Sequence, residues 1–164
     1  MIRIVRATLA DLKTITGIAH KTWPLTYGEI LSKEQLDYML NAFYSDKGLR
    51  ENIENGHEFI LAKEADSILG FASFEPHYEK GNAIKIHKIY ILPETQGKGI
   101  GKLLIDTIAL FAKEKNATSL LLNVNRFNTA LTFYQKLGFK IIQEIDIELD
   151  FGYLMEDYVM EKEI

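Results

Sequence analysis

The sequence predicts a mixed α/β fold of the α+β kind, in one domain that spans residues 1–164. Apolar residues recur at helical spacing in the first third of the chain, and short strand-like segments then follow one another with turn residues between them. A glycine-rich turn next joins a strand to a long amphipathic segment. We find no linker or internal repeat, and the length suits a single core.

The composition is typical of a globular protein and excludes several classes of function. Hydrophobic residues make up 47% and charged residues 26% of the 164 positions. The formal net charge of −4 argues against a general nucleic-acid binder, which is normally basic. No apolar run reaches the roughly 20 residues of a membrane-spanning helix, and the N-terminus lacks the apolar core of a signal peptide. We therefore expect a cytoplasmic protein that binds neither nucleic acid nor membrane.

The first half of the chain is expected to place helices after an opening strand. Apolar and charged residues alternate in that strand, and Thr8 and Ser32 begin the next two helices as capping residues. The first helix should end before Trp23 and Pro24, because the residue before a proline avoids the α region; Tyr27 then lies in a loop. We expect the strand and three helices at residues 2–6, 12–22, 32–43 and 46–54.

The second half is expected to consist mainly of strands, with two helices inserted. Turn residues around Asp66 and Gly81 separate three strands, which should therefore pair antiparallel. Three glycines open the first helix, whose apolar residues keep helical spacing up to Phe111. Asn128 caps the second helix and Gly138 closes it. We expect these elements at residues 59–62, 68–74, 83–92, 100–115, 119–124 and 130–137, followed by a hairpin of 139–149 and 153–160.

The turn Gln96-Gly97-Lys98-Gly99-Ile100-Gly101 is the most informative segment. Glycine has no Cβ and accepts positive φ, so a ligand can approach the backbone closely. The free amides and partial positive charge of a helix N-terminus favour an anion, usually a phosphate. A P-loop is excluded because only three residues separate Gly97 from Gly101 and Leu103 stands where a hydroxyl is needed. A dinucleotide fingerprint is excluded because the spacing is G-x-G-x-G after antiparallel strands.

The same segment matches Q/R-x-x-G-x-G/A, and here the chain resembles the GNAT superfamily of acetyl-CoA-dependent N-acetyltransferases over nearly its whole length. The resemblance extends to Ile89-Tyr90-Ile91-Leu92-Pro93 and to Asn128–Phe139, which is similar to the family's A-x-x-F-Y-x-K-x-G-F segment. It implies an acyl-CoA N-acyltransferase fold: a mixed, mostly antiparallel sheet, splayed between its fourth and fifth strands, with helices on both faces. It further implies acetyl-CoA as cosubstrate, a small-molecule or peptide amine as acceptor, and a homodimer as a common state.

On this resemblance, a strand edge and the glycine turn hold the cosubstrate. The amides from Gly97 to Lys102 would bind the pyrophosphate, with positive charge from Lys98 and Lys102. The pantetheine arm would pair with the strand edge like an added strand, and Asn128 would also reach the cosubstrate. The expected cofactor-binding residues are Ile89, Tyr90, Ile91, Gln96, Gly97, Lys98, Gly99, Ile100, Gly101, Lys102, Asn128 and Tyr134.

The resemblance also implies direct acetyl transfer, with Tyr134 as the acid that protonates the leaving thiolate. The attacking amine must lose a proton because its reference pKa is near 10.4, and the thioester oxygen needs a donor such as an amide near Ile91. His87, with a reference pKa near 6.5, is one candidate for the base, and Glu75 acting through water is another. The chain has no cysteine to carry the acetyl group. Its four histidines form no helical pair, so we expect no metal site.

The acceptor pocket is expected on the other side of the splay, between the helical N-terminal region and the C-terminal hairpin. Aromatic side chains and one carboxylate are the candidates for its lining: Trp23, Tyr27, Phe74, Glu75 and Phe151. The chain as a whole is similar to the polyamine-acetylating and protein-acetylating branches of the family, which favours a polyamine-like molecule or a protein or peptide amine as acceptor. A non-catalytic regulatory module that binds CoA with the same fold is the alternative from another class.

Overall fold

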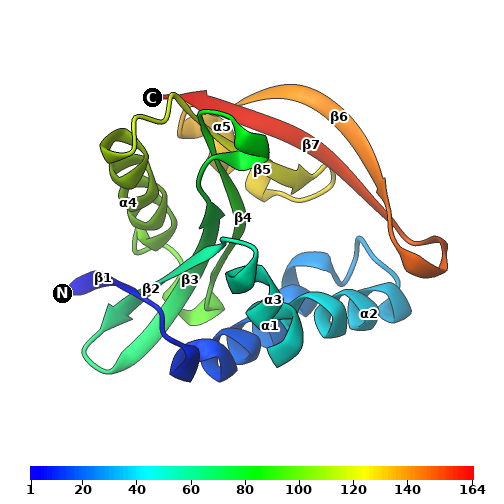
Figure 1. Ribbon diagram of the computed structural model, residues 1–164. Coiled ribbons are helices and arrows are strands. Elements are labelled where there is room, and N and C mark those ends of the chain that lie inside the picture. Colours follow the sequence, from blue (N-terminus) through cyan, green and yellow to red (C-terminus); the bar gives the residue numbers. More distant parts are fainter.

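One seven-stranded sheet runs through the protein in the order β1-β2-β3-β4-β5-β7-β6 (Figure 1). The computed structural model describes every residue from Met1 to Ile164. The strands are β1 (Ile2–Arg6), β2 (Glu58–Glu64), β3 (Ser67–Glu75), β4 (Ala83–Ile91), β5 (Ser119–Asn125), β6 (Lys140–Glu148) and β7 (Leu154–Glu163). The helices are α1 (Leu12–Tyr27), α2 (Lys33–Tyr44), α3 (Asp46–Glu54), α4 (Ile100–Glu114) and α5 (Ala130–Lys136). Neighbouring strands are antiparallel except β4 and β5, so the predicted mixed, mostly antiparallel fold is confirmed.

The sheet opens between β4 and β5, as the resemblance predicted. Their parallel ladder has only four residue pairs, of which the last joins Ile86 to Leu122. β4 continues beside β3 as far as Ile91, so residues 87–91 have no strand neighbour on their other edge. Buried backbone groups without hydrogen bonds are costly. The open edge is therefore suited to a ligand or to water.

A β-bulge in the middle of β4 determines which way its side chains point. The register between β3 and β4 shifts between Ser73 and Phe74, where His87 is the extra residue on β4. Bulges of this kind redirect the side chains that follow them. Lys88 and Tyr90 consequently point to the face of the sheet that α1, α2 and α3 cover.

Two hydrophobic cores lie on opposite faces of the sheet (Figure 1). α4 covers one face, where Leu104 is fully buried, and α1, α2 and α3 cover the other, where Ile15 is fully buried. Successive strand residues supply the two cores in turn, since Phe71 belongs to the second core and Ala72 to the first. None of the helices has the length and apolar character that crossing a membrane requires.

The first helix is longer than the sequence predicted. α1 continues through Trp23 and Pro24 to Tyr27, and the Gly28 N–H donates to the Pro24 carbonyl at 2.9 Å. A proline inside a helix costs about 3 kcal/mol. Burial compensates for this cost: Trp23 is only 4% exposed, and its ring centre lies 4.6 Å from that of Tyr27. The expected loop was therefore wrong, and both aromatic residues lie on a helix.

The hairpin of β6 and β7 extends from the end of the sheet over α2 (Figure 1). Gln35 Nε2 donates to the Leu154 carbonyl at 2.7 Å, and the Tyr38 hydroxyl donates to the Asp150 carboxylate at 3.0 Å. These contacts join segments that are 119 and 112 residues apart in sequence. The start of β7 thereby comes to lie beside the N-terminal helices.

Candidate active site

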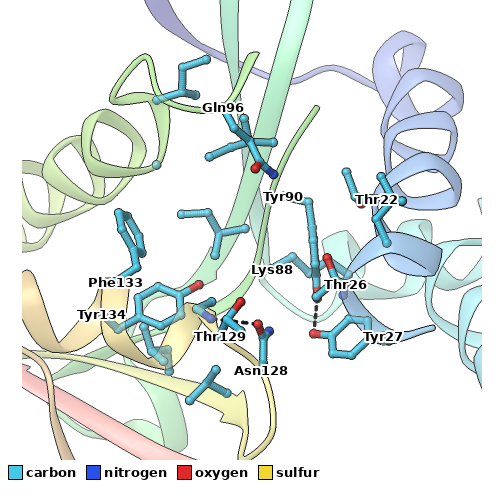
Figure 2. Close-up of a pocket in the computed structure, with 18 of the residues that line it drawn as sticks. Thr22, Thr26, Tyr27, Lys88, Tyr90, Gln96, Asn128, Thr129, Phe133 and Tyr134 are labelled. Carbon is cyan, nitrogen blue, oxygen red and sulfur yellow. Dashed lines mark hydrogen bonds between the residues drawn. The ribbon is translucent and has the colours of Figure 1, made fainter. Parts of the chain in front are cut away.

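The splay between β4 and β5 opens into a cavity of about 870 Å³ (Figure 2). Its walls come from the open edge of β4, the start of α4, the loop before α5, α5 itself and the last turns of α1. Tyr134 and Phe133 lie on one side, and Tyr27 and Tyr90 lie on the other (Figure 2). A cavity of this volume is typical of small-molecule and cofactor sites.

The glycine turn forms the end of this cavity at the N-terminus of α4. Gly97 and Gly99 have φ values of +85° and +74°, in the left-handed region that favours glycine. Gly101 is favoured for another reason, because a Cβ there would lie 3.0 Å from the Phe133 ring and 3.2 Å from the Ile91 side chain, both of which would have to shift. The first amides of α4 are free of intrahelical partners and carry partial positive charge. The turn therefore has the geometry of an anion site.

Nearly all residues predicted to bind the cosubstrate line this cavity. They are Ile89, Tyr90, Ile91, Gln96, Gly97, Gly99, Ile100, Gly101, Lys102, Asn128 and Tyr134. Lys98 is exposed and does not line it. Lys102 pairs with Asp106 at 2.6 Å within α4. The Asn128 Oδ1 atom accepts from the Ala130 N–H at 2.9 Å, but the N-cap position of α5 is Thr129 rather than the predicted Asn128, which lies one residue earlier.

Tyr134 lies on α5 with a buried ring and a hydroxyl that points into the large cavity (Figure 2). Its ring centre lies 5.3 Å from that of Phe133 and 6.0 Å from that of Phe139, both edge-on. Burial, with a smaller contribution from Tyr27, raises the pKa of Tyr134 well above its ordinary value of 10.0. The hydroxyl therefore keeps its proton at neutral pH and can donate it inside the cavity.

A second cavity of about 270 Å³ adjoins the first, between α1, α2, α3 and the start of β7. Residues that line both cavities mark the junction: Tyr27, His87, Lys88, Tyr90 and Asn123. The remaining wall is mostly aromatic or apolar and includes Trp23, Leu31, Met39, Phe43, Tyr44, Leu154 and Met155. This cavity lies where the sequence predicted the acceptor pocket.

The structure separates the side chains that were predicted to line the acceptor pocket. Trp23 and Tyr27 do line the smaller cavity. Phe74 lies on the opposite face of the sheet, where its ring centre is 5.2 Å from that of Phe111 in the core under α4. Phe151 is 82% exposed at the tip of the hairpin. The predictions for Phe74 and Phe151 were wrong, because strand alternation directs Phe74 to α4 and the long hairpin carries Phe151 past the cavity.

His87, Glu75 and His57 form a connected group beside the junction. Glu75 Oε1 lies 2.9 Å from His87 Nε2 and 3.3 Å from His57 Nε2. A carboxylate only accepts hydrogen bonds, so both rings present Nε2–H to it and His87 Nδ1 remains the basic nitrogen. Burial lowers the pKa of His87 to about 4 and also lowers that of His57, so both rings are neutral at neutral pH. Glu75 itself lines neither cavity.

The same three side chains have ligand atoms within 4.8 Å of one another, close enough to consider a metal ion. The two imidazole rings, however, are stacked 4.1 Å apart and only 3° from parallel. Their lone pairs lie in two separate parallel planes, so an ion in the plane of one ring is out of the plane of the other. Zinc sites need donors that converge tetrahedrally on the ion. This stacking supports the sequence-based prediction of no metal site, which stays a prediction.

Two charged residues of the smaller cavity, Lys88 and Asp157, were not predicted. Lys88 Nζ donates to Asn52 Oδ1 at 3.1 Å and lies 5.3 Å from the centre of the Tyr44 ring. Burial lowers the pKa of Lys88 to about 8. Asp157 accepts from Asn123 Nδ2 at 3.4 Å, and burial raises the pKa of Asp157. The one sequence signal for Lys88 was its place directly after His87, where the alternation of apolar and polar residues in the strand is interrupted.

Known proteins resemble this chain in sequence and in fold. The family model described as acetyltransferase (GNAT) domain matches residues 55–141. The spermidine N(1)-acetyltransferase of Thermoplasma acidophilum is 29% identical over 167 aligned positions, which cover 98% of this chain and 96% of that protein. The ribosomal protein bS18 alanine N-acetyltransferase of Haemophilus influenzae is 35% identical over 98 residues, 58% of this chain and 63% of that protein. The crystal structure of the PaiA N-acetyltransferase from Thermoplasma acidophilum in complex with coenzyme A superimposes with a TM-score of 0.82 and 27% identity, covering 100% of this chain and 99% of that one.

Proposed function

The chain belongs to the GNAT family of acetyltransferases, and we propose that it transfers the acetyl group of acetyl-CoA directly to a primary amine within a ternary complex. The observation that carries this proposal is the junction of two cavities. The larger one holds the open strand edge and the glycine turn, and the smaller one is a separate chamber that meets it at His87 and Lys88. Two substrates can therefore be bound at once. The absence of cysteine supports direct transfer, because no acetyl-cysteine can form.

The residues of the larger cavity fit acetyl-CoA. The open edge at residues 87–91 offers backbone donors and acceptors to the amides of the pantetheine arm. The turn at Gly97–Gly101 offers backbone amides to the pyrophosphate, and Lys102 adds positive charge beside it. The coenzyme A complex of the Thermoplasma relative supports this part of the proposal.

We assign the role of general acid to Tyr134. Its raised pKa keeps the hydroxyl protonated until the carbon–sulfur bond breaks. The hydroxyl then donates to the departing sulfur, a thiolate whose conjugate acid has an ordinary pKa near 8.5. One carbon–nitrogen bond forms as one carbon–sulfur bond breaks, and the proton that the amine loses balances the proton that the sulfur gains.

We assign the role of base to His87, with Glu75 as a positioning residue. His87 lines both cavities whereas Glu75 lines neither, which favours His87 as the group that meets the amine directly or through water. Glu75 holds the ring through the 2.9 Å contact to Nε2 and leaves Nδ1 free to accept. With a pKa of about 4, His87 is a weak base, so it takes the proton late, when attack has made the amine nitrogen acidic.

A thiol-release assay with acetyl-CoA tests the proposal. The names of the two relatives give spermidine and a ribosomal-protein alanine as acceptors, so polyamine-like amines and peptide N-termini belong in the panel beside amino acids and aminoglycosides. We expect amine-dependent thiol release with at least one acceptor, and mass spectrometry of the product should show one added acetyl group. A non-catalytic CoA-binding module predicts CoA binding by calorimetry with no thiol release for any amine.

A further inference from the structure

Lys88 is a largely enclosed ammonium group without an acidic partner. Its Nζ makes one hydrogen bond, to the Asn52 amide oxygen at 3.1 Å, and lies over the Tyr44 ring. It forms none of the ion pairs of the protein. An ammonium has three donors, and buried charges are ordinarily paired. Lys88 therefore has donors and a positive charge that remain available to a ligand.

The other charged residue of the smaller cavity, Asp157, is only 3% exposed and already accepts a hydrogen bond. Lys85 Nζ donates to Asn123 Oδ1, and Asn123 Nδ2 donates to Asp157 Oδ2 at 3.4 Å. The positive charge of Lys85 also acts on Asp157 directly. The smaller cavity thus offers an incoming molecule the ammonium of Lys88, which has no ion pair, whereas its one carboxylate is buried and hydrogen-bonded to Asn123.

The rest of the wall suits a small apolar body. Trp23, Met39 and Phe43 contribute apolar surface, as do the side chains at the start of β7. The volume of about 270 Å³ corresponds to roughly nine water-sized volumes, enough for a molecule the size of an amino acid.

We infer that the smaller cavity is an acceptor subsite for an apolar α-amino acid, with Lys88 as the counter-ion of the acceptor's carboxylate. This inference rests on the proposed function and names its class of acceptor. Lys88 and His87 both line the junction of the cavities, so a carboxylate at Lys88 brings an α-amine to His87 and to the larger cavity. The apolar side chain of the acceptor then occupies the smaller cavity. A polycation such as spermidine would meet an unpaired positive charge and a carboxylate that is buried and hydrogen-bonded to Asn123.

Methionine and methioninamide are a matched pair of probes, because only methionine has the carboxylate. Calorimetry on the CoA-bound wild-type chain should show methionine binding about 10- to 100-fold more tightly than methioninamide or spermidine, the gain expected from a hydrogen-bonded charge pair. The KM for the acceptor should follow the same order. Equal binding of methionine and methioninamide, or no binding of methionine, overturns the inference, and this comparison needs no variant.

Lys88→Met should bring the ratio of the two dissociation constants close to one without changing the affinity for CoA, whereas Lys88→Arg should keep most of the preference. Lys113→Met removes the same charge from an exposed position on α4 and is the control. A preference that persists in Lys88→Met overturns the inference. The proposed function is tested separately. If no amine causes thiol release, the proposal of acetyl transfer is overturned. Methionine binding that depends on Lys88 would still support the subsite.

Discussion

The two cavities of the site differ in which parts of the chain form them: mainly backbone groups in one and mainly side chains in the other. The larger cavity, the proposed cosubstrate half, uses the backbone of β4 and of the glycine turn, within segments that are close together in the sequence. The smaller cavity, the proposed acceptor half, uses side chains from α1, α2, α3 and β7, which lie at opposite ends of the chain. The cosubstrate half therefore depends on the positions of the glycines and on the register of the strands. The other depends on tertiary packing and on a few enclosed charges.

The largest expected effect is in the cosubstrate half. Gly99→Glu places a side chain at φ +74° and a negative charge at the N-terminus of α4, where the pyrophosphate is proposed to bind. We expect CoA binding to be lost in calorimetry. Gly152→Glu is a matched control, since Gly152 has φ +75° and open space around its Cβ position but lies in the hairpin. If Gly99→Glu bound CoA as tightly as the wild type does, the glycine turn would not be the site of the pyrophosphate.

Tyr134→Phe should have the next largest effect, on turnover rather than on binding. Loss of a general acid lowers the rate by about 10²- to 10⁴-fold. The affinity for acetyl-CoA should change little, because the ring and its edge contacts with Phe133 and Phe139 remain. Tyr153→Phe removes a hydroxyl from the hairpin region and should leave kcat unchanged. If Tyr134→Phe keeps wild-type kcat, Tyr134 is not the acid.

The sequence predicts the cosubstrate half better than the acceptor half. The glycine turn, the strand before it and the helix that carries Tyr134 were predicted because each depends on neighbouring residues. The splay was predicted through the family resemblance, since no local pattern reports where a ladder stops. Trp23 and Pro24 were misassigned to a loop because burial of aromatic rings outweighs a local backbone preference.

The smaller cavity, the proposed acceptor half, was predicted in its location and in two of its side chains, Trp23 and Tyr27. Whether a strand residue such as Phe74 faces one core or the other depends on its place in the strand alternation. His57 lies thirty positions before His87 in the sequence, and their stacking depends on tertiary folding that one sequence does not report. Lys88 could be seen in the sequence as one of two lysines in its strand, but its lack of an acidic partner can be recognised only from the structure. Contacts between distant segments are what sequence reasoning missed.

His87→Gln should lower kcat/KM about 10²-fold, the low end of the rate loss expected when an acid–base group is removed.

The pH profile of the wild type is a more specific test of His87 as the base. His87 accepts a proton only when neutral, so activity should fall as pH drops through its lowered pKa of about 4, rather than through the ordinary value of 6.5. Glu75, His57, Lys88 and Tyr78 are titratable groups that face it. If activity instead fell around pH 6.5, or if the fall at low pH persisted in His87→Gln, another residue would be the base. His77→Gln, which changes an exposed histidine, is the control.

The smallest effects separate the true wall of the acceptor half from the hairpin tip. The Tyr27 hydroxyl is 3.0 Å from that of Tyr90 at the junction of the cavities, and losing one such hydrogen bond costs about 1 kcal/mol. Tyr27→Phe should therefore raise the KM for the acceptor about 5-fold with acetyl-CoA affinity unchanged. Phe151→Ala should change it by less than about 2-fold, because that ring is exposed beyond the cavity. The two substitutions change aromatic residues that the sequence could not distinguish: one loses a hydroxyl and the other loses a ring. If Phe151→Ala raised the KM for the acceptor more than Tyr27→Phe does, the hairpin tip would belong to the acceptor site. That result would contradict the conclusion that Phe151 lies outside the cavity.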